Sequence, residues 1–316
     1  MASIHKTVLL NETIEGLNLP ASPRLGGQKD LSALVLDCTF GGGGHSLEVL
    51  KRFPKAKVIA IDQDKNAFEK ARGKFEGLED RITFVNTNFG ELDSGVGHLG
   101  SWCPTSESRC FDGIIFDLGL SSDQLENSGR GFSFMKDEPL LMTMKENPSP
   151  EDLTAIDIVN TWSEKSLADI IYGYGEERYS RRIAKGIVDA RVKSEIKTTS
   201  DLVKIINEAV PGAYRRGRLH PATKTFQALR IAVNDELGVL QKGLESGFIL
   251  LKDGGRMSVI TFHSLEDRIV KRFFKKMVEE EKARLINKKI IKANSEELKN
   301  NPRSRSAKLR ILEKQK

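Results

Sequence analysis

The stretch Asp37-Cys-Thr-Phe-Gly41-Gly42-Gly43-Gly44-His45-Ser46 decides the fold of this chain. It continues a short apolar run, Ala33–Asp37, which suits a strand that is buried on both faces. A helix is expected to begin at about Ser46. Four consecutive glycines are entropically costly, but they let the backbone turn sharply and approach a ligand closely. The stretch therefore predicts a strand, a glycine-rich ligand loop and a helix; a flexible turn is the simpler alternative.

Further apolar runs recur along the chain, and each has the length of a buried strand. They are Lys57–Asp62, Ile82–Val85, Phe111–Asp117 and, much later, Arg256–Phe262 after a turn at Gly254-Gly255. A last candidate, Leu309–Leu312, is expected at an edge of the sheet. Helix-length stretches such as Lys65–Phe75 lie between the early runs. This alternation predicts an α/β protein with a parallel sheet.

The segment between the fourth and fifth strands has a different character. Ser149-Pro-Glu-Asp152 is typical of a helix start, and an apolar stripe from Leu202 to Val210 predicts a helix ending at Pro211. A second stripe, from Phe226 to Leu251, is expected to lead back to the sheet. We therefore expect a sheet domain in two parts, 1–137 and 218–316, and a helical substrate-recognition insert over 138–217.

The composition excludes several classes of protein. The chain has 316 residues, of which 39% are hydrophobic and 30% charged, and no apolar window is long enough to span a membrane. The first ten residues lack the pattern of a secretion signal. Cys38, Cys103 and Cys110 have neither an even number nor the spacing of zinc ligands. We expect a reduced cytoplasmic protein without a membrane partner, a disulfide framework or a metal.

Charge is distributed unevenly along the chain. The formal net charge is +6, but residues 264–316 hold 17 Lys and Arg against 8 Asp and Glu, a net charge of +9. A basic segment of this kind is typical of a surface that meets a polyanion, and equally of a solvated lysine-rich helix.

Polar side chains follow the other predicted strands at the positions where each strand ends. Asp62 ends the second strand, where a carboxylate can accept both ribose hydroxyls of an adenosine cofactor, and Asp64 is the better cap for the following helix. Phe89 follows the third strand, where an aromatic ring can lie against adenine; a core position is the alternative. Asp117 ends the fourth strand. These features predict a ligand site at the carboxyl ends of the strands.

Two cofactors satisfy this arrangement, S-adenosylmethionine and a nicotinamide dinucleotide. The loop does not fit G-x-G-x-x-G, because Ser46 stands where the third glycine is needed. The polar segment Asp117–Gln124 also suits the amine and carboxylate of methionine better than a nicotinamide ring. The residues favour a methyltransferase over a dehydrogenase.

Motifs along nearly the whole chain closely resemble the bacterial ribosomal RNA small subunit methyltransferase H family, also called MraW. The motifs are His5–Leu10, Asp37–Ser46, Asp117–Gln124, Arg130–Met135, Tyr174–Arg178, His220–Arg230, Phe262–Phe273 and Asn301–Arg305. One departure lies at Leu140–Lys145, where the family usually has Leu-Asp-Met-Arg-Met-Asp. Contacts made by those acids and that arginine are not carried over to this chain.

The resemblance implies a Rossmann-like S-adenosylmethionine-dependent methyltransferase sheet with an inserted all-helical domain. It implies N(4)-methylation of one cytidine in the decoding centre of 16S rRNA, within the small ribosomal subunit. It further implies that these residues contact the cofactor: Gly43, Gly44, His45, Asp62, Phe89, Asp117 and Gln124. The alternatives are a non-catalytic rRNA-binding assembly factor and, less favoured, an NAD-dependent oxidoreductase.

Cytosine N4 is a poor nucleophile, so an enzyme is expected to orient the amine and accept a hydrogen bond from it. Asp117, Ser121, Ser122 and His263 are the candidates for this catalytic rim. A helix-start residue satisfied by the backbone is the alternative for His263. A covalent cysteine is unnecessary, and Cys38 is expected to be a buried structural thiol.

A base within folded rRNA has to be flipped into such a pocket, so we expect phosphate-binding side chains around it. The candidates are Arg215, Arg216, Arg218, Lys224, Lys271, Arg272, Lys275, Lys276, Arg303, Arg305, Lys308 and Arg310. The helix around Phe274 and Met277 is expected to bury its apolar side and expose its basic one.

Overall fold

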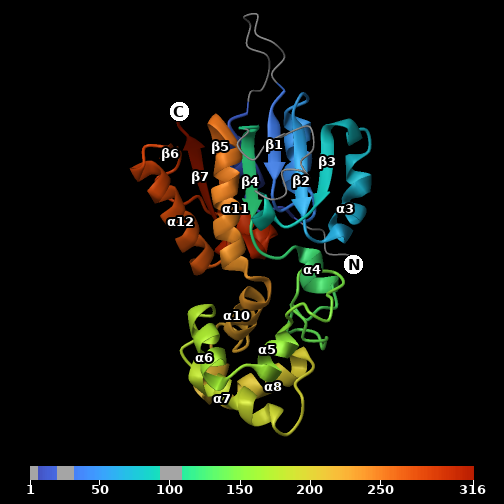
Figure 1. Cartoon of the computed structure of the whole chain (residues 1–316), viewed down its shortest axis with the longest axis vertical. Helices are drawn as coiled ribbons and strands as arrows, with labels where there is room; N and C mark the ends of the chain where they lie inside the picture. Colours follow the sequence, from blue (N-terminus) through green and yellow to red (C-terminus); the bar gives the residue numbers. More distant parts are fainter. Residues whose placement is uncertain (1–5, 20–31, 93–108) are drawn as a thin grey trace, which may run out of the picture. The chain divides into compact units, whose positions relative to one another are not determined.

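The computed structural model describes residues 6–19, 32–92 and 109–316 (Figure 1). His5 and Cys103 lie outside the described residues. The chain divides into two compact units. The first unit comprises Met1–Gly119 and Leu237–Lys316, and the second comprises Leu120–Glu236.

The first unit contains a seven-stranded sheet in the order β3-β2-β1-β4-β5-β7-β6 (Figure 1). Its strands are β1 (Leu34–Asp37), β2 (Lys57–Asp62), β3 (Ile82–Asn86), β4 (Phe111–Asp117), β5 (Leu251–Thr261), β6 (Ala283–Leu285) and β7 (Lys308–Lys314). The first five strands pair in parallel, and β7 runs antiparallel to both β5 and β6. The predicted α/β class and parallel sheet are confirmed.

Two details of the predicted sheet are wrong. β7 is not an edge strand, because it lies between β5 and β6, and the three-residue β6 forms the edge. Gly254 and Gly255 do not precede β5 but lie within it, close to a register shift against β4. Gly254 has a φ of 77°, which a glycine adopts without strain, so the strand passes through this irregularity.

Helices cover both faces of the sheet, as in other α/β folds. α1 (Leu10–Leu17), α2 (Gly44–Arg52) and α3 (Lys65–Ala71) pack on one face. α11 (Glu236–Leu250) and α12 (Ser264–Glu279) pack on the other. Side chains of β2 alternate between these layers: Val58 and Ala60 face the first, and Ile59 and Ile61 face the second. A short helix, α13 (Ser295–Asn300), precedes β7.

The second unit is helical and has its own core. Its helices are α4 (Ser122–Asn127), α5 (Ala155–Thr161), α6 (Glu164–Gly173), α7 (Ser180–Arg191), α8 (Thr199–Ala209), α9 (Gly212–Arg215) and α10 (Thr223–Asn234). The helix predicted at Ser149–Asp152 is wrong, because those residues form a turn in which Ser149 and Asp152 bond to each other. Helix α5 begins later, capped by Thr154 and Asp157.

The apolar stripe from Phe226 to Leu251 is divided between two helices, α10 and α11, and only α11 leads back to the sheet. Asp235, between α10 and α11, has a φ of 44°, and this left-handed residue breaks the helical run. Phe226 and Leu229 are buried in the core of the second unit, whereas Leu240 and Leu244 are buried in the core of the first. The second unit is therefore wider than the predicted insert, 138–217.

The two cysteines among the described residues differ in their bonding state. Cys38 is a free, buried thiol, and burial, aided by the charge of Asp37, raises the pKa of that thiol well above its usual range. Cys110 is disulfide-bonded, so the prediction of a chain without disulfides is wrong at this residue. Among the described residues, no helix combines the length and apolarity needed to span a membrane.

Candidate active site

Three aspartates end the neighbouring strands β2, β1 and β4: Asp62, Asp37 and Asp117. Burial raises the pKa of Asp37 and of Asp62 to about 6. The hydrogen bond from the Ser46 hydroxyl and backbone N–H groups at Asp37, and backbone N–H groups at Asp62, lower the pKa and offset only part of this rise. Burial also raises the pKa of Asp117 well above its usual range, and the nearby charges of Asp37 and Glu266 raise it further. The carboxyl end of the sheet is therefore an acidic, desolvated site that favours ligands with hydrogen-bond donors or positive charge.

Asp37 organises the loop that follows β1. Its Oδ2 accepts a hydrogen bond from the Ser46 hydroxyl of α2 at 2.6 Å, and its Oδ1 accepts one from the Thr39 N–H at 3.2 Å. Thr39 in turn ties the loop to β4, because its Oγ1 accepts the Asp117 N–H at 2.6 Å. Asp37 is not among the predicted site residues, although it carries the same sequence signal as Asp62 and Asp117, an acid at the end of a buried strand.

The glycine run meets conformational and packing demands of the loop itself. Gly41 and Gly43 have φ values of 51° and 73°, which favour glycine. A Cβ on Gly44 would come within 1.8 Å of the Thr7 hydroxyl oxygen, and one on Gly43 within 2.7 Å of the Phe40 ring. The run therefore has a structural explanation at three positions. Contact between Gly43 or Gly44 and a cofactor stays a prediction.

Asp62 holds the other side of this loop. Its Oδ2 accepts the Gly41 N–H at 2.8 Å, and its Oδ1 accepts the Asp64 N–H at 2.9 Å. Asp64 caps α3 through the Asn66 N–H, as predicted. Asp62 is therefore bonded within the protein, but each of its carboxylate oxygens has a second lone pair for a donor such as a ribose hydroxyl.

Asp117 has unused hydrogen-bonding capacity. Its Oδ1 is buried and has no hydrogen-bond partner among the described residues, while its Oδ2 lies 3.6 Å from Nδ1 of the buried His45 at the start of α2. A buried carboxylate oxygen without a donor is costly, so the position is suited to a ligand that supplies one. This is the strongest geometric indication of a ligand in the first unit.

Phe89 packs mainly into the core. It begins a single 3₁₀ turn after β3, and its ring meets the Phe116 ring edge-on at 5.5 Å. It also covers α11 so closely that a Cβ on Gly243 would approach its ring to 2.5 Å. The core alternative explains this residue, and an additional contact with adenine stays a prediction.

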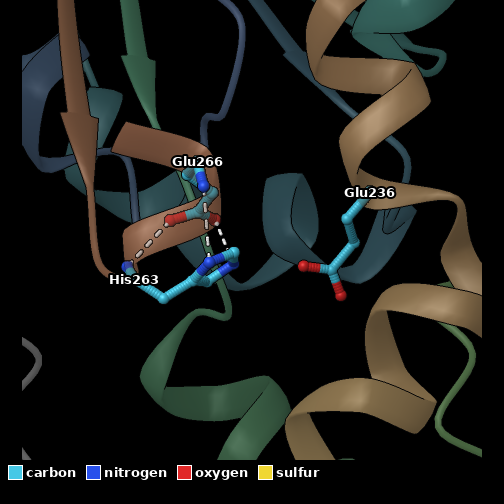
Figure 2. A group of neighbouring side chains, drawn as sticks. All are labelled: Glu236, His263 and Glu266. Atoms are coloured by element: carbon cyan, nitrogen blue, oxygen red, sulfur yellow. Dashed lines mark hydrogen bonds and ion pairs between the residues drawn. The ribbon is translucent and has the colours of Figure 1, made fainter. Parts of the chain in front are cut away.

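His263 caps α12 together with Glu266, and Figure 2 shows the two side chains turned toward each other. The imidazole Nδ1 accepts the Glu266 N–H at 3.4 Å, and Nε2 lies 3.2 Å from the Glu266 carboxylate. Glu266 also accepts the N–H groups of Phe262 and His263. Glu236, the third residue drawn, forms a two-bond ion pair with Arg230. The helix-start alternative for His263 is confirmed, and its catalytic role stays a prediction.

Ser121 and Gln124 belong to the second unit and cap α4 reciprocally. The Ser121 hydroxyl accepts the Gln124 N–H at 3.1 Å, and Gln124 Oε1 accepts the Ser121 N–H at 3.0 Å. The Gln124 side-chain NH₂ is not needed for this cap and remains available as a donor. Ser122 is the first residue of α4, and its side chain lies outside the description.

The predicted basic face of α12 is confirmed. Phe274 and Met277 are buried, and Lys271, Arg272, Lys275 and Lys276 are exposed. Lys275 and Lys276 form ion pairs with Glu279 and Glu280, one turn further along the helix.

Other predicted RNA-binding residues divide into two groups. Arg215, Arg216, Arg218, Arg303 and Arg305 are exposed. Lys224, Lys308 and Arg310 are less exposed and donate hydrogen bonds within the protein, and Arg303 also has a partner there. Lys224 donates to the Glu176 carbonyl at 2.8 Å, and Lys308 and Arg310 bond to Asp267 at 3.2 and 2.8 Å. An RNA contact by these three side chains would have to compete with internal bonds.

The fold and site together define a Rossmann-like α/β protein whose sheet has an acidic, desolvated carboxyl end. The family model of the MraW methylase family matches residues 2–315, and the chain belongs to this family. The predicted family and the methyltransferase class are thereby confirmed over the dehydrogenase alternative.

Relatives in several bacteria are similar over their full length. The chain is 47% identical to ribosomal RNA small subunit methyltransferase H of Lactobacillus johnsonii over 98% of both chains. It is 47% identical to the protein of that name in Acaryochloris marina, over 98% of this chain and 94% of that one. Among solved structures, NSun6 from Pyrococcus horikoshii with SFG matches at 12% identity and a TM-score of 0.44, covering 98% of this chain and 53% of that one. That similarity is too low to indicate function.

Proposed function

We propose that this methyltransferase transfers a methyl group from S-adenosylmethionine to N4 of a cytidine in the decoding centre of 16S rRNA. Asp117 carries the cofactor part of the proposal, because its buried Oδ1 lacks a donor that the cofactor's amine can supply. The names of the full-length relatives support the small-subunit rRNA substrate. The position N4 and the decoding-centre cytidine rest on the sequence motifs.

The cofactor-binding roles follow from the geometry of the first unit. We assign the ribose hydroxyls to Asp62, which also holds the loop at Gly41. Gly43, Gly44 and His45 begin α2, where the backbone can approach the cofactor closely, and Phe89 lies after β3. Gln124 has a free NH₂ that suits the cofactor's carboxylate.

When bound, S-adenosylmethionine supplies an electrophilic methyl group on a sulfonium. The protein has to hold the cytosine amine in line with that methyl group, because the N4 lone pair is delocalised into the ring. With Asp117 Oδ1 assigned to the cofactor's amine, we propose Asp117 Oδ2 as the acceptor for a hydrogen of the cytosine amine, and the hydroxyls of Ser121 and Ser122 as further rim groups. An acceptor in a desolvated site also receives the proton that N4 loses as its bond to carbon forms. His263 is assigned a positioning role through the cap that it forms with Glu266 at the start of α12.

Methyl transfer from labelled S-adenosylmethionine to small subunits that lack the modification tests the proposal. We expect label in 16S rRNA at one cytidine, identified as N4-methylated by nucleoside mass spectrometry. Free 16S rRNA serves as a second substrate and distinguishes naked RNA from the assembled subunit. Binding of the subunit without transfer of label would instead support a non-catalytic assembly factor. Label on another base or atom would overturn the assignment to cytidine N4.

A further inference from the structure

Six arginines cluster in two segments of the helical unit, and all are exposed. They are Arg178, Arg181, Arg182, Arg215, Arg216 and Arg218. Within the described residues, none of these six side chains forms an ion pair or a hydrogen bond. Several arginines of the first unit, among them Arg109, Arg256 and Arg284, each bond to an acidic side chain. What distinguishes the cluster is that six arginines without such a bond among the described residues lie in two short segments of one unit.

A buried carboxylate ties the two segments together. Glu177 is fully buried, its Oε1 accepts the Tyr179 N–H at 2.9 Å, and its Oε2 accepts the Tyr214 hydroxyl hydrogen. The rings of Tyr179 and Tyr214 meet edge-on at 4.9 Å. Tyr214 directly precedes Arg215, so this bond fixes the second arginine segment against the first.

Arg178 is held over these rings. Its guanidinium carbon lies 4.8 Å from the centre of the Tyr179 ring and 5.1 Å from that of Tyr214. Stacking on aromatic faces orders a guanidinium while leaving its N–H edge open for a planar or tetrahedral anion. The side chain is therefore exposed and also preorganised.

The charge of the cluster is local. Residues 120–236 contain 17 Lys and Arg against 18 Asp and Glu, so the unit as a whole carries no positive excess. Grouping like charges is unfavourable, and a partner with several regularly spaced negative charges relieves that repulsion. Arginine forks match phosphate oxygens in geometry, and a nucleic-acid backbone presents phosphates in series.

We propose that this cluster binds phosphates of the RNA strand that carries the target nucleotide, with Glu177 and Tyr214 as positioning residues. The inference rests on the proposed RNA methyltransferase function. It extends that function to Arg178, Arg181 and Arg182, which are not among the RNA-binding residues predicted from the sequence.

The test replaces Arg178, Arg215 and Arg216 by glutamine together in the full chain. Binding of a labelled single-stranded RNA of the target sequence is measured at several salt concentrations, and methyl transfer to unmodified small subunits is measured in parallel. We expect the RNA Kd to rise on the order of tenfold or more near 0.1 M salt, and the slope of log Kd against log salt to fall by about 2. The Kd for S-adenosylmethionine is expected to stay unchanged.

A matched control removes the same charge elsewhere. Lys51, Arg72 and Lys193 are exposed and unpaired among the described residues, and replacing all three by glutamine should leave the RNA Kd and slope close to wild type. Tyr214→Phe is the second variant, since it keeps every arginine and both rings but removes the bond to Glu177. If Tyr214 positions the arginines, the slope of log Kd against log salt should be smaller for Tyr214→Phe than for wild type. If Tyr214 is purely structural, only the melting temperature of the variant should fall.

The outcomes separate the two proposals. If wild type methylates small subunits and the triple arginine variant binds RNA with wild-type affinity and slope, the arginine cluster is not an RNA site. The same conclusion follows if the control variant loses as much affinity as the arginine variant. If wild type transfers no methyl group to rRNA, the proposed function fails whatever the variants do.

Discussion

At the scale of single residues, the three strand-end aspartates make the first unit sensitive to pH. Asp37 and Asp62 are desolvated, and most of their hydrogen-bond donors are backbone N–H groups. Each therefore holds its proton more tightly in the folded protein than in the unfolded chain. A ligand that brings donors to these carboxylates offsets this effect and is bound best when they are ionised.

We expect Asp62→Asn to remove part of the pH dependence of stability. The folded-state pKa of Asp62 is about 6, against 3.8 for a free carboxyl. Between these values the folded protein binds more protons, so the contribution of Asp62 to stability is present below about pH 4 and is lost as the pH rises through about 6. The loss is on the order of 2–3 kcal/mol. Urea unfolding of wild type and Asp62→Asn over this range measures the difference, and parallel curves would contradict the prediction.

We expect Asp117→Asn to raise the Kd for S-adenosylmethionine by about 10- to 100-fold, because a charge-assisted hydrogen bond is lost. Isothermal titration calorimetry measures this change. Asp112→Asn is the matched control, since Asp112 lies on the same strand β4 but bonds to Lys252 at 2.8 Å. The idea fails if both variants bind the cofactor alike.

Local patterns in the sequence predict part of this site. Asp62 and Asp117 are recognised because an acid directly follows a buried apolar run. The bond between Asp37 and Ser46 joins a strand to a helix, and no local pattern reports such a partner. Similarly, four glycines suggest a ligand, whereas the tight contact of Gly44 with Thr7 depends on a distant segment. The role of such a motif therefore depends on tertiary contacts, which the local sequence does not reveal.

At the scale of elements, the start of α12 distinguishes capping from catalysis. We expect His263→Asn to retain both stability and methyl transfer, because asparagine is also a good N-cap. His263→Ala is expected to lose about 1 kcal/mol of unfolding free energy. Urea unfolding and labelled methyl transfer measure the two effects. A loss of turnover in His263→Asn at unchanged stability would instead make the imidazole a catalytic group.

The end of α11 depends on one lysine of β7. Lys314 is buried, and its Nζ donates to the carbonyls of Phe248, Ile249 and Leu251 at 2.7, 3.1 and 2.8 Å. Phe248 and Ile249 lie in the last turn of α11, where carbonyls have no partner within the helix and the helix dipole favours a cation.

We expect Lys314→Met to lower the free energy of unfolding by about 2–3 kcal/mol, since three buried carbonyls lose a charged donor. Urea unfolding followed by circular dichroism measures this loss. Lys316→Met, two residues further along and exposed, is the control and should change stability by less than about 0.5 kcal/mol. Equal stability of the two variants would show that the helix end does not need Lys314.

Element positions are predicted better than element partners. The runs at Lys57–Asp62 and Phe111–Asp117 coincide with β2 and β4, because apolar periodicity is local. The place of β7 inside the sheet depends on β6, whose three residues carry too little pattern to be recognised. The division of the Phe226–Leu251 stripe depends on a single left-handed residue, Asp235, which periodicity does not reveal.

At the scale of the whole molecule, each unit has its own buried core. The core of the helical unit draws only on residues between Leu120 and Val233, and this stretch of chain is continuous. The core of the sheet unit needs both of its chain segments.

We expect the segment 120–236 to fold when it is produced alone. Its core is complete, and short capped helices such as α5 and α8 carry their own start signals. Circular dichroism and a cooperative urea transition measure folding, and calorimetry should find no binding of S-adenosylmethionine. A non-cooperative transition would show that the helical core needs the sheet unit.

The +9 segment from residue 264 to 316 also has a different meaning in the folded protein. Lys308 and Arg310 bond to Asp267, Arg284 bonds to Glu313, and Lys314 is buried. Four of its basic side chains therefore have partners within the first unit. The basic face of α12 is exposed, as are Arg303 and Arg305, and these are the candidates for contact with an anionic partner.

The interior place of β7 has a consequence for how the chain is made. Because β7 pairs with both β5 and β6, it fills the gap between strands that the ribosome has already synthesised. The continuous helical segment can form during translation, but the sheet closes only after residue 314 has left the exit tunnel. The helical unit can therefore fold during translation before the seven-stranded sheet is complete.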